Sequence, residues 1–109
     1  MTYILIYTTC ADEDEAGKIA ESLVEKRYVA CANIFPPHRA VYRWEGKVES
    51  DGEVAMILKT REDLFEETRE EINRLHSYDT PAILAVPIIQ GEKAFLKFIE
   101  DETDELKRP

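Results

Sequence analysis

The sequence predicts an α+β protein: a ferredoxin-like βαββαβ sandwich with an antiparallel sheet and one extra helix at the C-terminus. Three observations lead to this prediction. Segments rich in β-branched and aromatic residues alternate with segments of helical periodicity. A double proline and a Glu-Gly pair divide the middle of the chain into a hairpin, and 109 residues are enough for one domain. Right-handed crossovers on either side of that hairpin give the split βαβ arrangement.

The first β-α-β unit is expected in residues 2–34. Thr2–Thr9 is rich in β-branched and aromatic residues, which is typical of a strand in the middle of a sheet. A helix is expected from Asp12, because Glu15 follows three residues later as in a capping box. Its apolar residues recur at intervals of three and four and therefore share one face: Ala16, Ile19, Ala20, Leu23 and Val24. The second strand is expected at Val29–Ile34.

The middle of the chain is expected to form a hairpin. Pro36-Pro37 ends the second strand, and extended segments follow at Ala40–Trp44 and Glu53–Thr60, the latter being the third strand of the sheet. Between these segments, Glu45-Gly46 supplies a turn pair.

Tyr42 and Trp44 lie near the tip of this hairpin. A domain of 109 residues has little core left to cover aromatic side chains placed so far out. Large apolar groups on a protruding ribbon indicate a partner surface. Tyr42 and Trp44 are therefore predicted to anchor contacts between copies, in an obligate oligomer held by the hairpin at Ala40–Ser50.

The remaining elements are a helix, a strand and a final helix. The helix begins near Glu62 and carries an apolar face made of Leu64, Phe65, Thr68, Ile72 and Leu75. Ala82–Val86 is the fourth strand, and Pro87 removes a donor from the ladder, which fits an edge strand or a bulge. The third helix is expected at Glu92–Glu105, with Phe95, Phe98 and Ile99 facing inward.

One face of the predicted sheet has no helical cover. Both crossover helices lie on the same face, whereas the strands offer apolar side chains to both faces. Packing three such sheets about a threefold axis would cover the second face, and closed cyclic symmetry prevents open-ended assembly. The sequence therefore predicts a homotrimer.

Composition excludes several classes of function. The formal net charge is −9, with 23 acidic and 14 basic residues, which disfavours nucleic-acid binding and concentrates cations near the surface. The sequence contains no apolar run of the roughly 18 residues that a membrane span needs. The two cysteines have no paired spacing, and the N-terminus begins directly as a strand without a signal-peptide pattern, so the cytoplasm is the expected compartment.

Several segments resemble the CutA divalent-cation-tolerance family. They are Ala30-Cys31-Ala32-Asn33-Ile34, Tyr42-Arg43-Trp44-Glu45-Gly46-Lys47-Val48, Leu58-Lys59-Thr60, His76-Ser77-Tyr78-Asp79-Thr80-Pro81 and Val86-Pro87-Ile88. The resemblance runs from Tyr3 to Ile99 in order and spacing, and makes residues 1–109 a single CutA-like domain. It implies a ferredoxin-like subunit in a tight homotrimer, similar in architecture to PII signalling proteins. It also implies a link to tolerance of copper and other divalent cations.

Two departures from the family pattern bear on metal binding. The usual His-Pro-Tyr-Glu or His-Pro-Tyr-Gln segment is His76-Ser77-Tyr78-Asp79 here. In some members a cysteine late in the first strand and a second histidine are proposed as copper ligands, and the matching positions hold Thr8 and Leu75. Of those three family ligands, only His76 is present.

His76 and Cys31 are predicted as ligands for copper or another divalent cation, because imidazole and thiolate are the soft ligands near family-matched positions. Tyr78 and Asp79 are predicted to line a small polar cleft beside His76. Structural alternatives stay open, since the segment 76–79 also suits a helix stop and turn, and Cys31 also suits a small buried position. Cys10, at a strand end, is given no role.

A binding function is expected rather than a catalytic one. The sequence contains no Gly-rich phosphate loop, HExxH or GxSxG motif, and pairing Cys31 with His76 and Asp79 as a nucleophile–base set requires an adjacency that the sequence does not establish. The predicted function is a small homotrimer that binds divalent metal ions and contributes to metal tolerance. Two alternatives are a PII-like regulatory trimer with a small effector in its intersubunit clefts, and a structural trimer that anchors another protein.

Overall fold

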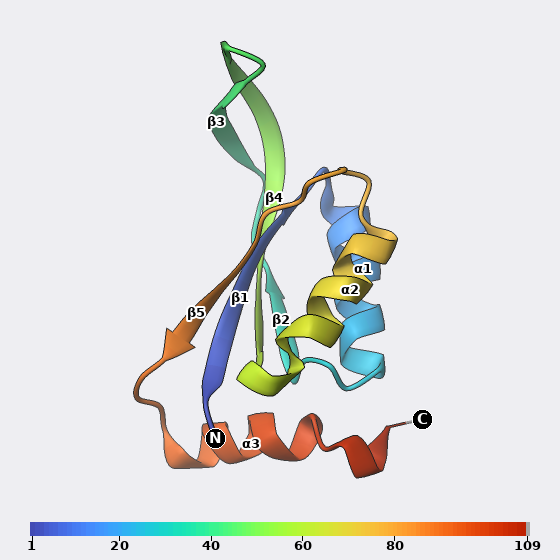
Figure 1. Ribbon diagram of the computed structural model, residues 1–109, viewed down its shortest axis with the longest axis vertical. Coiled ribbons are helices and arrows are strands. Elements are labelled where there is room, and N and C mark those ends of the chain that lie inside the picture. Colours follow the sequence, from blue (N-terminus) through green and yellow to red (C-terminus); the bar gives the residue numbers. More distant parts are fainter. Residues whose placement is uncertain (109) are drawn as a thin grey trace.

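The computed structural model describes residues 1–108 and has the predicted α+β architecture (Figure 1). Its sheet is antiparallel, with strands in the ferredoxin-like order β2-β4-β1-β5. These strands are β1 (Tyr3–Cys10), β2 (Cys31–Ile34), β4 (Lys47–Arg61) and β5 (Ile83–Ile88). Pro87 lies in β5 at the edge of the sheet, where a residue without an N–H is tolerated.

Two helices cover one face of this sheet. They are α1 (Glu13–Glu25) and α2 (Phe65–Leu75), which follows a 3-10 turn at Glu62–Leu64 (Figure 1). The core lies between the helices and the sheet, and its largest fully buried side chains include Ile6, Ile19, Leu23, Met56, Leu58 and Ile72. The predicted apolar face of α1 is confirmed except for Val24, which is exposed. Within residues 1–108, no helix is long and apolar enough to cross a membrane.

The start of α1 has the predicted capping arrangement. Asp12 Oδ1 accepts a hydrogen bond from the N–H of Glu15 at 2.9 Å. In return, the carboxylate of Glu15 accepts from the N–H of Ala11 at 2.9 Å, one residue before the cap. These reciprocal bonds fix the first turn of α1 and hold Glu15 against the end of β1.

A two-stranded ribbon protrudes from the sheet (Figure 1). β3 (His38–Trp44) pairs with Lys47–Glu53 of β4, and we call these paired segments the ribbon. Glu45 and Gly46 form the predicted turn, with φ values of 49° and 79°, because a type I′ hairpin turn requires positive φ at both central residues. β4 is one continuous strand of 15 residues, so the ribbon and the sheet share a single backbone.

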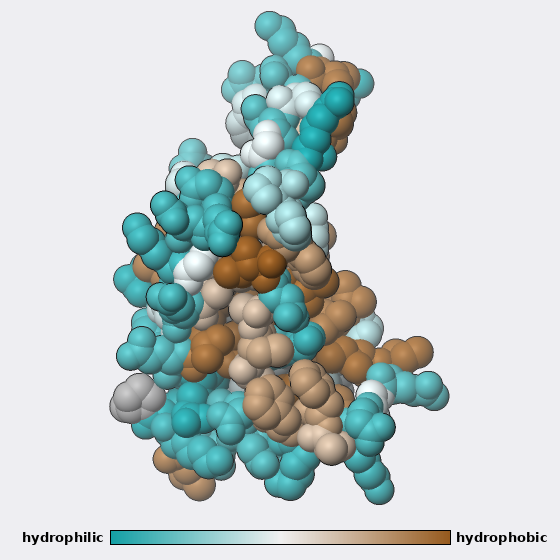
Figure 2. Space-filling model, turned by 180° about the vertical axis from the view of Figure 1, so that it is seen from behind, coloured by the Kyte–Doolittle hydropathy of each residue, from teal (hydrophilic) through white to brown (hydrophobic). Residues whose placement is uncertain are grey.

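The face of the sheet opposite α1 and α2, which we call the open face, is largely apolar. Strand alternation and register place Leu5 and Tyr7 of β1 beside Val86 and Leu84 of β5 on this face. Leu84 exposes 59% of its surface and Val86 exposes 51%. Seen from behind, apolar side chains spread over the middle of the body below the ribbon (Figure 2). The prediction that the helices leave one sheet face uncovered is therefore confirmed.

α3 (Lys93–Glu102) lies across the end of the sheet near the N-terminus (Figure 1). The prediction that Phe95 and Phe98 face inward is wrong, because each exposes 41% of its surface while Ile99 is buried. A helix that crosses the end of a sheet, rather than covering a face, can bury only a narrow stripe. Phe95 and Phe98 instead contact each other, with ring centroids 5.4 Å apart, and the Lys59 ammonium lies 5.1 Å from the Phe95 ring.

The end of the chain is tied to α1 by one arginine. Arg27, which follows α1 with φ 60°, donates from Nη1 to the carbonyl of Glu102 and from Nε to the carbonyl of Lys107, both at 3.1 Å. Lys107 ends a 3-10 turn at Glu105–Lys107. Arg27 thereby holds α3 and this turn against the helical layer.

A buried carboxylate joins the two long helices. Glu71 of α2 is 5% exposed and accepts hydrogen bonds from Arg74 at 2.7 and 2.8 Å and from the hydroxyl of Ser22 in α1. The ammonium of Lys26 lies 2.9 Å from the same carboxylate. The bonds from Arg74 are the largest influence, and with Ser22 and Lys26 they outweigh burial and hold the pKa of Glu71 well below its ordinary value.

Replacing Glu71 with glutamine is expected to destabilise the folded chain by about 1–3 kcal/mol at neutral pH. The reason is that the group accepting hydrogen bonds from Arg74 and Lys26 loses its negative charge. The folded-state pKa of Glu71 is depressed, so its stabilisation is present above the unfolded pKa of about 4.3 and is lost as pH falls toward the folded pKa. The difference in free energy of unfolding between wild type and Glu71→Gln, measured by chemical denaturation, should therefore shrink below about pH 4.

Glu66→Gln is the matched control for this prediction. Glu66 also pairs with an arginine three residues later, Arg69, at 3.0 Å, but this pair lies on the exposed side of α2. Its loss should change the free energy of unfolding by less than about 0.5 kcal/mol. Equal destabilisation by the two variants would contradict the assigned role of burial at Glu71.

Candidate functional site

The structure does not bring the two predicted metal ligands, His76 and Cys31, together. His76 follows α2, and its Nε2 lies 2.8 Å from the carbonyl oxygen of Thr9, near the end of β1. Cys31 instead lies opposite Lys59 of β4, which in turn lies opposite Leu5 of β1. Leu5 is four residues from Thr9, or about 13 Å along the strand. Cys31 and His76 of one chain are therefore too far apart to bind the same metal ion.

Two other residues lie beside His76: Cys10 and Glu15. The thiol, the carboxylate and the imidazole offer ligand atoms that all lie within 4.8 Å of one another. Cys10 is the last residue of β1 and is fully buried, and the side chain of His76 is also fully buried. We call Cys10, Glu15 and His76 the polar cluster.

Sequence reasoning missed two members of the polar cluster. The available signal was the short connection between β1 and α1, which leaves two residues between Cys10 and the first helical residue. That connection forces the thiol of Cys10 close to the first turn of α1, where Glu15 lies. The approach of His76 to the same place depends on how α2 packs, which no local pattern encodes.

Hydrogen bonds fix the tautomer and position of His76. Its Nδ1 accepts from the backbone N–H of Tyr78 at 3.0 Å, so Nε2 carries the proton that is donated to Thr9. Glu15 reinforces this turn, because its Oε2 accepts from the N–H of Ser77 at 2.8 Å. The distance from Nδ1 of His76 to Oε1 of Glu15 is 3.8 Å. The turn after α2 is thereby attached to both β1 and α1.

Burial and charge set the ionisation of the cluster. Burial, with smaller contributions from nearby carboxylates such as Glu15, raises the pKa of the Cys10 thiol to about 12. Burial also raises the pKa of Glu15, but hydrogen bonds from Ala11 and Ser77 outweigh it and hold that pKa below its usual value. At neutral pH the cluster therefore contains a protonated thiol beside a charged carboxylate.

Tyr78 and Asp79, the predicted cleft residues, differ in their surroundings. The hydroxyl of Tyr78 donates to Oε2 of Glu53 at 3.0 Å, and the hydroxyl of Thr9 lies 3.5 Å from the same oxygen. Burial, followed by the bond to Glu53, raises the pKa of Tyr78 to about 12. Tyr78 thus joins the turn to the base of the ribbon, and its ring lies 4.7 Å from the ring of His76, whereas Asp79 is exposed.

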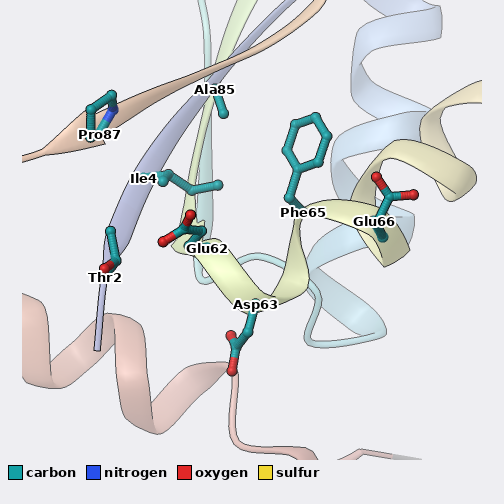
Figure 3. Close-up of a pocket in the computed structure, with 8 residues that line it drawn as sticks. All are labelled: Thr2, Ile4, Glu62, Asp63, Phe65, Glu66, Ala85 and Pro87. Carbon is teal, nitrogen blue, oxygen red and sulfur yellow. The ribbon is translucent and has the colours of Figure 1, made fainter.

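A pocket of about 560 Å³ lies elsewhere, between the start of α2 and the edge strand β5 (Figure 3). It is lined by Thr2, Ile4, Glu62, Asp63, Phe65, Glu66, Ala85 and Pro87. The carboxylates of Asp63 and Glu66 point away from its apolar side chains (Figure 3) and pair with Arg61 and Arg69, at 3.3 and 3.0 Å. Two of the three lining acids are thus already paired with arginines, and Glu62 is the remaining carboxylate, so the pocket is a weak candidate for a metal cation.

Comparison with known proteins places the chain among characterised sequences and structures. Residues 4–102 match the model of a family described as CutA1 divalent ion tolerance protein. The divalent-cation tolerance proteins CutA of Pyrococcus horikoshii and Archaeoglobus fulgidus are 48% and 50% identical over 100 residues, which cover 92% of this chain and 97% and 96% of theirs. A solved structure described as the periplasmic divalent cation tolerance protein CutA of A. fulgidus has a TM-score of 0.91 at 45% identity, covering 94% of this chain and 99% of that one.

Cys10 is expected to resist thiol reagents in the folded protein. With a pKa of about 12, about one thiol in ten thousand is ionised at pH 8, and burial excludes the reagent as well. In a Cys31→Ser variant, where Cys10 is the remaining thiol, labelling should be at least about 100-fold slower in the folded protein than in the unfolded chain. In a Cys10→Ala variant Cys31 is the remaining thiol, and its labelling rate provides the comparison. Equal rates for folded and unfolded Cys31→Ser protein would contradict the buried, protonated state of Cys10.

Proposed function

This chain belongs to the CutA1 divalent ion tolerance family, and from that premise we propose that it is a homotrimer that binds divalent metal ions and thereby contributes to metal tolerance. The observation that supports metal binding is the polar cluster, in which a thiol, a carboxylate and an imidazole converge at the end of β1. The relatives are named for tolerance rather than for a reaction, and the proposed role is binding.

The donor types of the cluster suit a borderline or soft divalent cation. Thiolate and imidazole favour zinc and copper over magnesium or calcium, and a carboxylate is a common further ligand. In metal sites a ligating histidine usually donates its other ring N–H to a carbonyl or carboxylate. His76 already has this arrangement, since Nε2–H donates to the carbonyl of Thr9, while Nδ1, 3.8 Å from Oε1 of Glu15, carries the lone pair that would bind the metal.

One ligand pair of the cluster, His76 and Glu15, has nearly the spacing that a small cation needs. Ligands that bind at about 2.1 Å in tetrahedral geometry lie about 3.4 Å apart, and Nδ1 of His76 is 3.8 Å from Oε1 of Glu15. Glu15 can keep its bonds from Ala11 and Ser77, because each carboxylate oxygen has a second lone pair. His76 has to exchange one bond, the one that Nδ1 accepts from the N–H of Tyr78.

Ionisation of Cys10 is the main energetic cost of loading this site. A bound dication stabilises the thiolate form, so binding releases the thiol proton. Glu15 needs no such change, because its pKa is already held low. Cys10 thus replaces Cys31 in the proposed ligand set, while His76 is retained from the sequence prediction.

Titration with Zn²⁺ tests the proposed site, because Zn²⁺ does not oxidise the thiol. Wild-type protein should bind Zn²⁺ in calorimetry with release of about one proton per ion, whereas Mg²⁺ should give no comparable heat. Cys10→Ala and Glu15→Gln should each weaken Zn²⁺ binding by roughly tenfold or more.

Cys31→Ala is the matched control for Cys10→Ala, since it removes the other thiol from the open face. Its isotherm should equal that of wild type. Identical isotherms for all four proteins would show that the metal binds elsewhere. Loss of Zn²⁺ binding in Cys31→Ala, with binding retained in Cys10→Ala, would show that Cys31 is the thiol ligand.

The open face supports the homotrimeric part of the proposal. It presents apolar side chains such as Leu84 and Val86 that α1 and α2 cannot reach. The aromatic side chains of Tyr42 and Trp44 extend the exposed apolar surface along the ribbon, with Trp44 60% exposed. Three copies related by a closed threefold axis bury such a surface without leaving a free interface.

Trp44→Ala is expected to weaken self-association by about 2 kcal/mol or more at each interface, as truncation of an aromatic anchor does. Sedimentation velocity of the wild type should give three times the chain mass of 12.6 kDa. Val24→Ala provides a control, because Val24 is an exposed apolar residue on the helical side. A wild-type monomer at micromolar concentration would contradict the homotrimer.

A further inference from the structure

The pocket between the start of α2 and β5 has an apolar floor that the helices leave uncovered. Ile4 of β1 is on the helical side of the sheet, and Pro87 of β5 lies opposite it in register. Ala85, two residues before Pro87, is on the same side. Both residues of β5 are exposed, so α1 and α2 do not extend over this edge of the sheet. The ring of Phe65, at the start of α2, forms the facing wall (Figure 3).

One end of this pocket is polar. A smaller hollow of about 370 Å³ adjoins it, because the two share Thr2, Glu62 and Asp63 as lining residues. The N–H of Glu62 donates to the carbonyl of Thr2 at 2.8 Å, which fixes the 3-10 turn before α2 against the start of β1. We call the pocket and the adjoining hollow the edge cleft. Its floor is apolar near Phe65, and its other end carries the carboxylate of Glu62.

Glu62 is the acid of the edge cleft that is free to bind a ligand. Within residues 1–108 no ion pair involves Glu62, whereas the other two acids of the cleft pair with arginines. The carboxylate of Glu62 points toward β1 (Figure 3). Among the described residues, no lysine or arginine lines the cleft, and the α-ammonium of Met1 at its outer end forms no ion pair.

We propose that the edge cleft binds a small organic monocation, an ammonium group carried on an aliphatic or aromatic body. One free carboxylate is too few for a bare metal ion, which takes several oxygen ligands. It can, however, pair with a single ammonium, while the apolar body of the ligand covers Ile4, Ala85 and the ring of Phe65. The volume of about 560 Å³ is in the range of small-molecule sites.

Charge sets the selectivity of the edge cleft. The formal net charge of −9 concentrates cations near the surface and disfavours anions. An alcohol of the same shape can cover the apolar floor but cannot form the ion pair with Glu62. A short alkylammonium can form the ion pair but cannot cover the floor. Binding of the cation therefore needs both parts of the ligand.

The edge cleft is separate from the polar cluster. Phe65 is the first residue of α2 and His76 follows its last residue, so about 16 Å of helix lies between the two sites. The cleft also lies on the side of the sheet opposite the open face. The inference therefore depends on neither the proposed metal binding nor the proposed homotrimer.

A matched series of probes tests the selectivity of the cleft in NMR titrations of the ¹⁵N-labelled protein. The expected result is saturable binding of 2-phenylethylammonium, with a dissociation constant on the order of millimolar for so small a ligand. The amide signals that shift most should be those of residues 62–66 and Ala85. The neutral analogue 2-phenylethanol should bind about threefold more weakly or worse, and 3-phenylpropionate and ethylammonium should not saturate.

Two substitutions test the two ends of the cleft separately. Glu62→Gln should weaken 2-phenylethylammonium binding about threefold or more and should remove its advantage over 2-phenylethanol. Ala85→Leu should abolish binding of both, because the larger side chain fills the hollow beside Phe65. Glu13→Gln makes the same charge change on an exposed position of α1, and Ala82→Leu adds the same side chain outside the cleft. Both control variants should bind as wild type does.

Several results would overturn the proposal. They are equal affinity of wild type for the amine and the alcohol, undiminished amine binding in Glu62→Gln or Ala85→Leu, and shifts centred outside the cleft. Equal weakening by Glu13→Gln and Glu62→Gln would also overturn it, because the amine would then respond to net charge alone. The circular dichroism spectrum of each variant should match that of wild type. Cys10→Ala should retain amine binding, which distinguishes this site from the polar cluster.

Discussion

The structure depends on the fact that a β-sheet has two faces and that this chain supplies helices for one. Alternation along β1 sends Ile4 and Ile6 into the core and Leu5 and Tyr7 to the opposite side. Because α1 and α2 are committed to the first face, the second face retains apolar surface that α3 reaches only at the end of the sheet. The proposed assembly is a consequence of that unequal cover.

The polar cluster has a structural role as well as a proposed binding role. Glu15 caps α1 and also holds the turn after α2, and His76 attaches the same turn to β1. The bonds that position the ligands are therefore the bonds that close the end of the core. For this reason, occupancy of the cluster and the stability of that end of the molecule are thermodynamically linked.

Features set by neighbouring residues could be predicted from the sequence. The turn at Glu45-Gly46, the cap formed by Asp12 and the edge position of Pro87 each follow from a local rule, and each is present. The order of the strands in the sheet could also be predicted from the sequence, because only a few connections are allowed for this alternation of strands and helices.

Features set by packing between distant segments could not be predicted in the same way. Cys10 and His76 are 66 positions apart in the sequence, and their approach depends on the axial position of α2 on the sheet. The exposure of Phe95 depends on α3 crossing the end of the sheet, although its periodicity is the same as that of a helix covering a face. Periodicity defines which residues share a side but not which partner that side meets.

The continuity of β4 restricts how the length of the ribbon can evolve. The same strand carries Met56 and Leu58 in the core and Glu49 and Asp51 on the ribbon. Since side chains alternate with a period of two, one inserted or deleted residue between these segments exchanges the two faces of everything beyond it. Matched insertions of two residues in β3 and β4 preserve both the core and the charge pattern. Members of this lineage should therefore differ in ribbon length by even steps, or carry a bulge wherever the step is odd.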